Sequence, residues 1–236
     1  MNLSMRRLRT FAFTALLAAA IPAAFAQTKA APAGNPPDLT GVYQIIPPNA
    51  VLAGGLKNIG GPADVPLVPA EKEKLRSVDV KTDPGRHCQP VGPFRMMARE
   101  ENKIELIPAT NGTIIMLFED LSRGVMRTIY MNRGHRTDLG PLWMGDSIGK
   151  WEGDTLVIDT NSFNDQTWLN ELGAQHSDAF HIVERIRPIL GGKVLEYKVT
   201  AEDPKALVKP YTYTRYYERS KTEIQQDNCI EDGEER

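Results

Sequence analysis

The strongest constraint on the fold is a series of tight-turn signals between short, strand-like segments in the second half of the chain. Asn111-Gly112 lies between the apolar segments 104–108 and 113–119. This dipeptide suits a two-residue hairpin because a type I′ turn needs positive φ at both central residues. Glu152-Gly153-Asp154 and Gly191-Gly192 are further hairpin signals. The second half is therefore expected to consist of strands joined by short turns.

About nine strands are expected, and one short helix is predicted at 69–76, which opens on a proline. The expected strands are 39–46, 104–108, 113–119, 125–131, a strand that ends at Trp151, 155–159, 179–188, 193–201 and 211–218. Successive hairpins form an antiparallel meander, which must close into a barrel or fold over to protect its edges.

The apolar alternation along these strands is interrupted by charged residues, namely Arg127, Glu184, Arg185 and Arg187. A small barrel filled only with apolar side chains does not need them, whereas a partly polar interior does. We therefore predict a mainly β chain whose antiparallel meander closes into a calycin- or lipocalin-like barrel or half-barrel, with one or two short helices.

The N-terminus has the pattern of a cleaved export signal. Arg6, Arg7 and Arg9 precede the apolar run 11–21, and Ala24-Phe25-Ala26 fits a small-x-small cleavage site. The run is short of the roughly 20 residues that a membrane-spanning helix needs. We expect a signal peptide at 1–26, a flexible lead-in at 27–38, one barrel-like domain at 39–236, and a periplasmic or secreted protein.

The charge balance argues against two classes of partner. The chain has 28 Lys and Arg against 30 Asp and Glu, and three of the arginines fall in the predicted signal. A mildly acidic mature chain without a Lys/Arg cluster is a poor candidate for binding nucleic acid or an anionic membrane. No stable membrane insertion is expected, and the sequence does not indicate an oligomeric state.

Cys88 and Cys229 are the two cysteines of the chain, and both lie in the predicted exported part. An even number of cysteines in an oxidising compartment indicates a disulfide. The alternative is a pair of free thiols that serve catalysis or bind a metal. Cys229 is close to the C-terminus, where a tether is useful and a nucleophile is not expected.

All three tryptophans lie between Trp143 and Trp168, so a site is expected near this stretch. Gly145-Asp-Ser147-Ile-Gly149 matches the G-x-S-x-G nucleophile motif, but that motif works at a strand-to-helix turn. The residues that follow Gly149 are instead typical of a strand. We interpret these glycines as relief of crowding in a curved strand.

Asn164 and Asp165 lie between Phe163 and Trp168 in a polar loop. One interpretation is a turn in which an Asn or Asp side chain hydrogen-bonds the backbone two residues on. The other is a polar wall beside an aromatic platform for a ligand.

Three histidines offer acid/base chemistry near neutral pH once a carboxylate orients one of them. The favoured pair is His176 with Asp165 or Asp178. If His181 faces the interior, Arg185 shares that face, which would then suit an anionic or carbonyl-bearing ligand. The predicted catalytic residues are His176, Asp178, Asp165 and His181, and the predicted substrate-binding residues are Asn164, Trp168, Trp143, Arg185 and His135.

No cofactor is expected, although a divalent metal is an open alternative. Nitrogen and oxygen ligands for a single ion could come from His135, Asp138, His176, Asp178 and His181. The spacing of His176 and His181 matches no motif with a known mechanism. The competing interpretation is that the histidines make structural hydrogen bonds.

Segments of the second half resemble a family of exported bacterial proteins. The matching segments are W-E-G-D-T-L-V-x-D-T at 151–160, F-N-D-x-T-W-L at 163–169, H-S-[DE] at 176–178, E-R at 184–185 and D-P-K at 203–205. The resemblance covers the stretch 143–210. It implies that these segments form one unit, and it implies no particular reaction.

Two functions remain open. The first is a cofactor-free enzyme of lyase or isomerase type that acts on an aromatic or cyclic molecule in a barrel pocket. The alternative is a non-catalytic barrel that binds a small molecule with the same residues. We expect the enzyme if His176 meets a carboxylate in a concave pocket, and the binding protein if it does not.

Overall fold

The computed structural model describes residues 35–58, 61–99, 102–119, 125–225 and 229. The predicted signal peptide 1–26 lies outside the described residues, as does most of the lead-in 27–38. In the part of the chain that is described, no helix combines the length and the apolar composition needed to cross a membrane.

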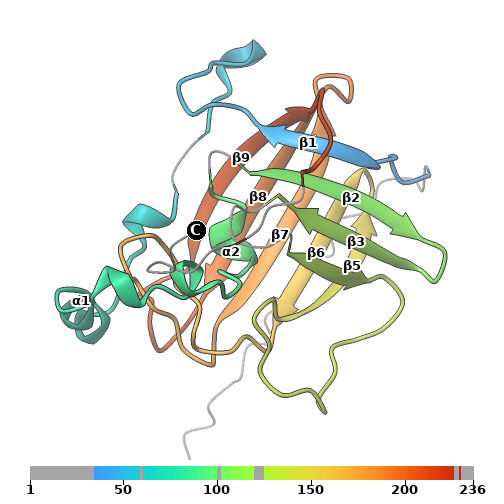
Figure 1. Ribbon diagram of the computed structural model, residues 1–236. Coiled ribbons are helices and arrows are strands. Elements are labelled where there is room, and N and C mark those ends of the chain that lie inside the picture. The colour runs from blue at the N-terminus through green and yellow to red at the C-terminus, as the bar shows by residue number, and fades with distance from the viewer. Residues whose placement is uncertain (1–34, 59–60, 100–101, 120–124, 226–228, 230–236) are drawn as a thin grey trace, which may run out of the picture. The chain divides into compact units, whose positions relative to one another are not determined.

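Nine strands form a closed barrel in sequence order (Figure 1). They are β1 Gly41–Ile45, β2 Lys103–Ala109, β3 Thr113–Phe118, β4 Met126–Tyr130, β5 Asp146–Glu152, β6 Thr155–Asn161, β7 His181–Ile189, β8 Val194–Glu202 and β9 Tyr211–Arg219. The barrel closes where β9 pairs with β1. The predicted closed, mainly β architecture is confirmed.

One junction departs from the antiparallel meander. Strands β4 and β5 run parallel, and they are joined only through Ile129 opposite Ser147 and Tyr130 opposite Ile148. A parallel pair needs a long connection, which here is the segment 131–145. The barrel wall therefore has few paired residues at this junction.

Helix α1 (Pro69–Leu75) lies where a helix was predicted, and a second short helix, α2 (Pro93–Met96), fills the barrel interior. In Figure 1, α2 lies next to β9. The hydroxyls of Tyr213 and Tyr217 on β9 donate to the carbonyl oxygens of Phe94 (2.5 Å) and Met97 (2.7 Å). Because Phe94, Met96 and Met97 are buried, α2 completes the core.

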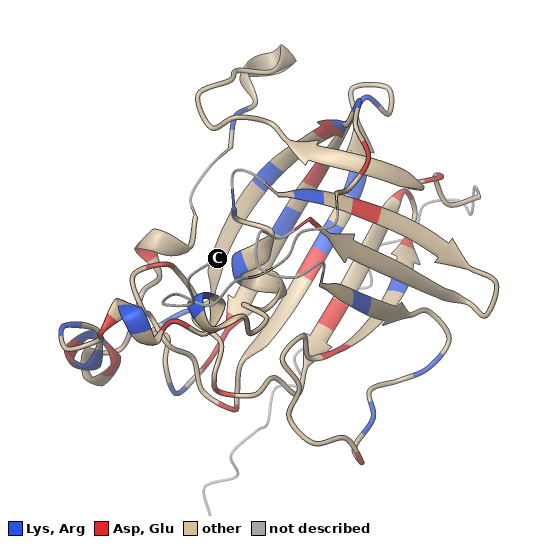
Figure 2. Ribbon diagram, viewed as in Figure 1, with Lys and Arg blue, Asp and Glu red and all other residues tan. Residues whose placement is uncertain are grey.

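The charged residues that interrupt the strands separate into two groups. Arg127 and Glu184 face inward and form a bidentate ion pair, with both nitrogen–oxygen distances at 2.7 Å. Tyr197 donates to the same carboxylate at 2.9 Å. Arg185 and Arg187 face outward. Figure 2 shows basic and acidic residues interspersed along the strands of the barrel. Of the four charged residues that interrupt the strands, two therefore form a buried pair in the interior and two lie on the outer wall.

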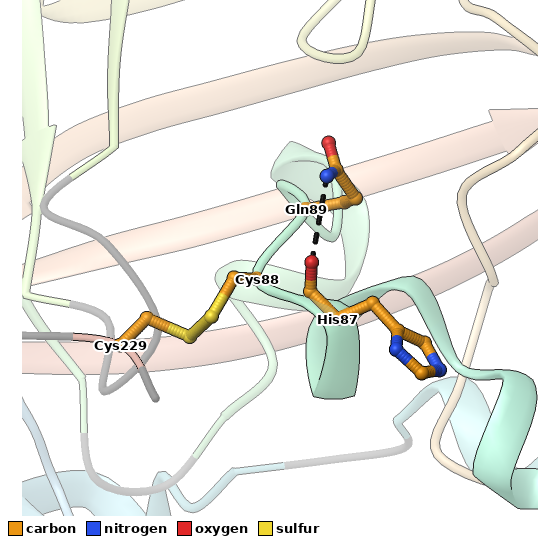
Figure 3. Close-up of a disulfide and its surroundings, with 4 residues drawn as sticks. All are labelled: His87, Cys88, Gln89 and Cys229. Carbon is orange, nitrogen blue, oxygen red and sulfur yellow. Dashed lines mark hydrogen bonds between the residues drawn. A yellow bond between two sulfur atoms is a disulfide. The ribbon is translucent and has the colours of Figure 1, made fainter. Parts of the chain in front are cut away.

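The predicted disulfide is confirmed. Cys88 and Cys229 are bonded (Figure 3), and the bond joins positions 141 residues apart in sequence. Cys88 follows the 3-10 turn Pro84–His87 and precedes α2. The bond therefore ties the far end of the chain to the segment that leads into α2.

Candidate functional site

A groove of about 410 Å³ lies on the barrel wall at the β4–β5 junction. Strand β4, the connection 131–145 and the start of β5 form its sides. Its apolar lining includes Met126, Tyr130, Leu142, Trp143 and Met144. Met126 is 58% exposed and Leu142 is 37% exposed, which is unusual for large apolar side chains. The groove therefore offers an apolar surface with an aromatic side.

Gly145 explains how the connection comes so close to the barrel wall. Its φ is +68°, and a Cβ there would lie 2.7 Å from the carbonyl oxygen of Asn161. Glycine is the residue that tolerates both the positive φ and the close approach. Ser147 of the G-x-S-x-G motif lies on β5, is buried, and hydrogen-bonds the Thr160 hydroxyl at 3.0 Å. A nucleophile exposed at a helix N-terminus is therefore not formed here.

Two cations, Arg133 and Arg136, and one acid, Asp146, lie at the groove, while Arg127, which also borders it, points inward to Glu184. The Arg133 guanidinium lies 3.7 Å from the centre of the Tyr130 ring, which is cation–π geometry. The same guanidinium forms an ion pair with Asp146. These contacts hold Arg133 in place at the rim.

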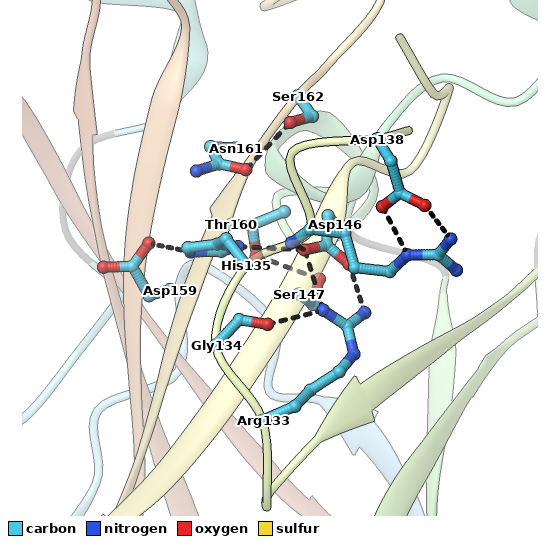
Figure 4. A network of polar contacts seen from close by, with 11 residues as sticks. Arg133, Gly134, His135, Asp138, Asp146, Ser147, Asp159, Thr160, Asn161 and Ser162 are labelled. Atoms are coloured by element: carbon cyan, nitrogen blue, oxygen red, sulfur yellow. Dashed lines mark hydrogen bonds and ion pairs between the residues drawn. The ribbon is translucent and has the colours of Figure 1, made fainter. Parts of the chain in front are cut away.

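A network of alternating aspartates and histidines lies beside the groove (Figure 4). His135 Nδ1 lies 3.1 Å from Asp146 Oδ2, and its Nε2 lies 2.9 Å from Asp159 Oδ1. His181 Nε2 contacts the same Asp159 oxygen at 2.9 Å. Because ionised carboxylates only accept, both nitrogens of His135 must donate for both contacts to be hydrogen bonds. The network therefore fixes the connection 131–145 to β5, β6 and β7.

Asp146 is the most strongly held carboxylate of this network. Burial by itself raises its pKa, but hydrogen bonds from Arg133, from the backbone N–H of Arg136 and from His135 outweigh burial and lower the pKa to about 2. The side chain is 2% exposed. The carboxylate is therefore charged at all but strongly acidic pH.

We expect the stabilising contribution of Asp146 to be lost in acid. Its ordinary pKa is 3.8, so the contribution is complete above about pH 4 and is lost as the pH falls towards about 2. The shift corresponds to about 2 kcal/mol at neutral pH. The measurement is urea unfolding of the wild type and Asp146→Asn from pH 7 to pH 2. Asp178→Asn, at an exposed ion pair, is the control. A stability difference for Asp146→Asn that did not shrink below about pH 4 would contradict this assignment.

His176 does not meet the carboxylates proposed for it. Its Nδ1 lies 2.9 Å from the Ser177 carbonyl oxygen, and its Nε2 lies 2.6 Å from the Thr167 hydroxyl. Its ring stacks on Phe180 with the centroids 4.4 Å apart. Burial lowers the pKa of His176, so the ring is neutral, with Nδ1 donating and Nε2 accepting. The predicted pairing with Asp165 or Asp178 is not formed, because Thr167 and Ser177 satisfy both ring nitrogens.

The polar loop that precedes His176 also forms a structural turn. Asn164 Oδ1 accepts from the backbone N–H of Gln166 at 3.2 Å, which is the self-capped turn proposed as one interpretation. Asp165 is exposed, and Asp178 pairs with Lys205 at 2.5 Å on the surface. Trp168 is 5% exposed. The structure does not bring these residues together around an open pocket.

Three other predicted site residues have different positions. Trp143 lines the groove. His181 lies on the outer face of β7, since Ile182 and Glu184 are the residues that face inward. Arg185 shares the outer face with His181, as expected, but it pairs with Glu152. The condition that this face lies inside the barrel is therefore not met, because alternation along β7 assigns the interior to Ile182 and Glu184.

His135 and His181 converge, but with Asp159 rather than with His176. Within the described ranges, no group of three or more His, Cys, Asp or Glu side chains is arranged to hold a metal ion. Asp138 forms an exposed pair with Arg136 at 2.6 Å. The metal hypothesis gains no support from these positions.

The sequence prediction missed Arg133, Asp146 and Asp159. Asp159 ends the apolar run 156–158, and Asp146 opens the β5 strand. Each is a carboxylate beside a strand-like run, which is a detectable but weak signal. Their convergence on His135 depends on the parallel β4–β5 junction, which no local pattern indicates.

No family model matches the chain, and no curated protein matches it. Among solved structures, the chain is similar to the wild-type fluorescent protein UnaG, with a TM-score of 0.37 and 10% sequence identity. The match covers 77% of this chain and 97% of that chain. The fold assignment rests on the strand pairing itself.

Proposed function

We propose that the protein is a non-catalytic barrel that binds a small molecule in the groove over the β4–β5 junction. The ligand has an aromatic or cyclic body and an anionic group. The observation that carries the proposal is the lining of the groove, where Trp143, Tyr130 and Met144 lie beside two solvent-accessible arginines and one aspartate. Ligand sites typically combine an apolar surface with a few placed polar groups.

Binding is favoured over lyase or isomerase chemistry because the proposed acid/base pair is absent from its expected place. His176 is buried among aromatic rings and its two nitrogens contact Thr167 and Ser177. The remaining histidine network holds the side of the groove, so its evident role is to position the connection 131–145. This proposal needs no cofactor.

We further propose that the protein binds its ligand outside the cytoplasm. The Cys88–Cys229 disulfide is typical of an oxidising compartment. The export signal predicted at 1–26 agrees with this location.

The experiment that tests the groove is a titration with naphthalene-2-sulfonate, monitored by calorimetry. We expect one saturable site. Trp143→Ala should weaken binding about tenfold, which is about 1.4 kcal/mol, because the aromatic side is lost. Arg136→Gln should weaken it severalfold, since it removes a cation from the lining while its partner Asp138 stays exposed.

The matched control is Arg185→Gln, which also removes an exposed arginine from an ion pair but lies outside the groove lining. It should bind as the wild type does. Naphthalene-2-methanol, the neutral analogue, should bind more weakly than the sulfonate. If Trp143→Ala and Arg136→Gln bind as tightly as Arg185→Gln, the groove is not the site and the proposal fails.

A further inference from the structure

A second concave site lies beside α2, with a volume of about 520 Å³. Arg95 and Arg99 from the α2 segment and Arg215 from β9 all line it. The acids in its lining are Asp64 and Glu171. Cationic side chains from separate elements therefore surround one pocket, and Glu171 offsets part of their charge.

Arg95 is fully engaged by two carboxylates. Asp83 accepts from its Nη1 at 2.9 Å and from its Nη2 at 2.5 Å. Glu171 accepts from Nε at 2.9 Å and also contacts Nη2. Arg95 and Asp83 are both buried, whereas the Glu171 side chain is 58% exposed. Asp83 thus neutralises Arg95 from within, and Glu171 contacts it from the solvent side.

Glu171 is not needed to hold its own loop. The Asn170 side chain does this by accepting from the backbone N–H groups of Leu172 (3.1 Å) and Ala174 (3.0 Å). Its Nδ2 donates to the Pro62 carbonyl at 2.8 Å. If Glu171 left the arginines, its carboxylate would be hydrated and the loss of an exposed ion pair would cost little, while Arg95 would keep its buried partner Asp83.

We propose that this pocket binds a small carboxylate, which takes the place of the Glu171 side chain on Arg95 and Arg99. Arg99 Nε already contacts Glu171 Oε1 at 3.1 Å, so the two guanidinium groups form a ready site for one planar, bidentate anion. The Glu171 carboxylate is then an internal competitor, which releases the site when a ligand carboxylate replaces it.

The rest of the lining indicates the body of the ligand. Pro62, Ala63, Ala98 and Leu172 supply apolar surface around the arginines, and Leu172 is 57% exposed. A monocarboxylate with a small apolar or aromatic body fits this lining. A phosphate can also accept two hydrogen bonds from a guanidinium fork, but it has no apolar body to contact this lining. Benzoate is therefore the probe, with inorganic phosphate as the second anion.

The experiment measures benzoate binding to wild type and Glu171→Gln by calorimetry. Removing the competing charge should increase the affinity at least about tenfold. The matched control is Glu73→Gln, which also removes one negative charge from an exposed pair with arginine but lies outside this pocket. It should bind as the wild type does. Adding Arg99→Gln to Glu171→Gln should reverse most of the gain.

Thermal unfolding of each variant shows whether it is folded, and Arg99→Gln alone provides a test that does not depend on changing Glu171. That variant should bind benzoate more weakly than wild type. The proposal is overturned if Glu171→Gln, although folded, binds no tighter than Glu73→Gln, or if Arg99→Gln has no effect. Tighter binding of phosphate than of benzoate to Glu171→Gln would overturn the assignment to carboxylates. Because benzoate is also an aromatic anion of the kind proposed for the groove, these titrations are made in the Trp143→Ala background, which leaves this pocket unchanged and so tests the two sites separately.

Discussion

Replacing Glu184 by alanine is expected to lower the free energy of unfolding by about 3–5 kcal/mol, the usual cost of removing one partner from a buried ion pair. Glu184 is 0% exposed and is held by both Arg127 and Tyr197. Without it, a guanidinium stays inside the barrel with no opposite charge. Burial raises the pKa of Tyr197 well above its usual range, so its hydroxyl stays neutral and does not replace the missing anion. Urea unfolding at pH 7 measures the change.

The double variant Arg127→Met, Glu184→Leu is expected to recover most of this loss. It removes both charges and also removes Arg127 Nε, which has no hydrogen-bond partner among the described residues. Replacing a buried pair by apolar residues of similar volume is often neutral or stabilising. Glu152→Ala, at the exposed pair with Arg185, should change stability by less than about 1 kcal/mol. If Glu184→Ala cost no more than Glu152→Ala, the buried pair would not be important for stability.

The barrel was predictable because its turns are encoded locally. Gly112, Gly153 and Gly191 all have positive φ in the structure. Asn111 does not, so the predicted two-residue type I′ turn is wrong in detail: Ala109 pairs with Thr113 across a three-residue loop that has glycine at its left-handed position. Each turn also sets the register of its two strands, so the series 103–118, 146–161 and 181–202 folds into hairpins without reference to the rest of the chain. Closure then follows from the need to cover two edges.

Helix α2 and the parallel junction were not predictable in the same way. Pro-Phe-Arg-Met at 93–96 is too short to show a helical period, and its burial depends on Tyr213 and Tyr217 more than a hundred positions later. The β4–β5 pair follows from the path of the connection 131–145, which carries no regular pattern. Both features are tertiary, so a local pattern does not reveal them.

The candidate site shows the same division. His135 and His181 were identified as chemically useful residues, but their shared partner Asp159 was not, since the contact crosses from a loop to two strands. His176 had two nearby aspartates in sequence, yet Thr167 and Ser177 are its partners in space. Proximity along the chain favoured Asp165 and Asp178. In the structure, both ring nitrogens of His176 have other partners, the Thr167 hydroxyl and the Ser177 carbonyl oxygen.

Removing the disulfide should have the other large effect. The double variant Cys88→Ala, Cys229→Ala is expected to lose about 4–5 kcal/mol, because the bond closes a sequence separation of 141 residues and so restricts the unfolded chain strongly. Guanidinium unfolding of the variant against the oxidised wild type measures the loss. The reduced wild type should unfold at the same denaturant concentration as the double variant, since both lack only the cross-link.

A second effect of the disulfide is local and separable from chain entropy. Cys88 has φ +59°, a conformation that costs a residue with a Cβ about 1–2 kcal/mol. The variant Cys88→Gly, Cys229→Ala should therefore be more stable than Cys88→Ala, Cys229→Ala by about 1 kcal/mol. Equal stabilities would contradict this, and would mean that the segment before α2 relaxes once the bond is gone.

A relaxed segment would also loosen the contact between Asp83 and Arg95, so benzoate binding to Glu171→Gln would weaken in that background. If the backbone is instead held by the cap on the 3-10 turn, where Asp83 accepts from the Gly85 N–H at 2.9 Å, the pocket keeps its affinity without the disulfide.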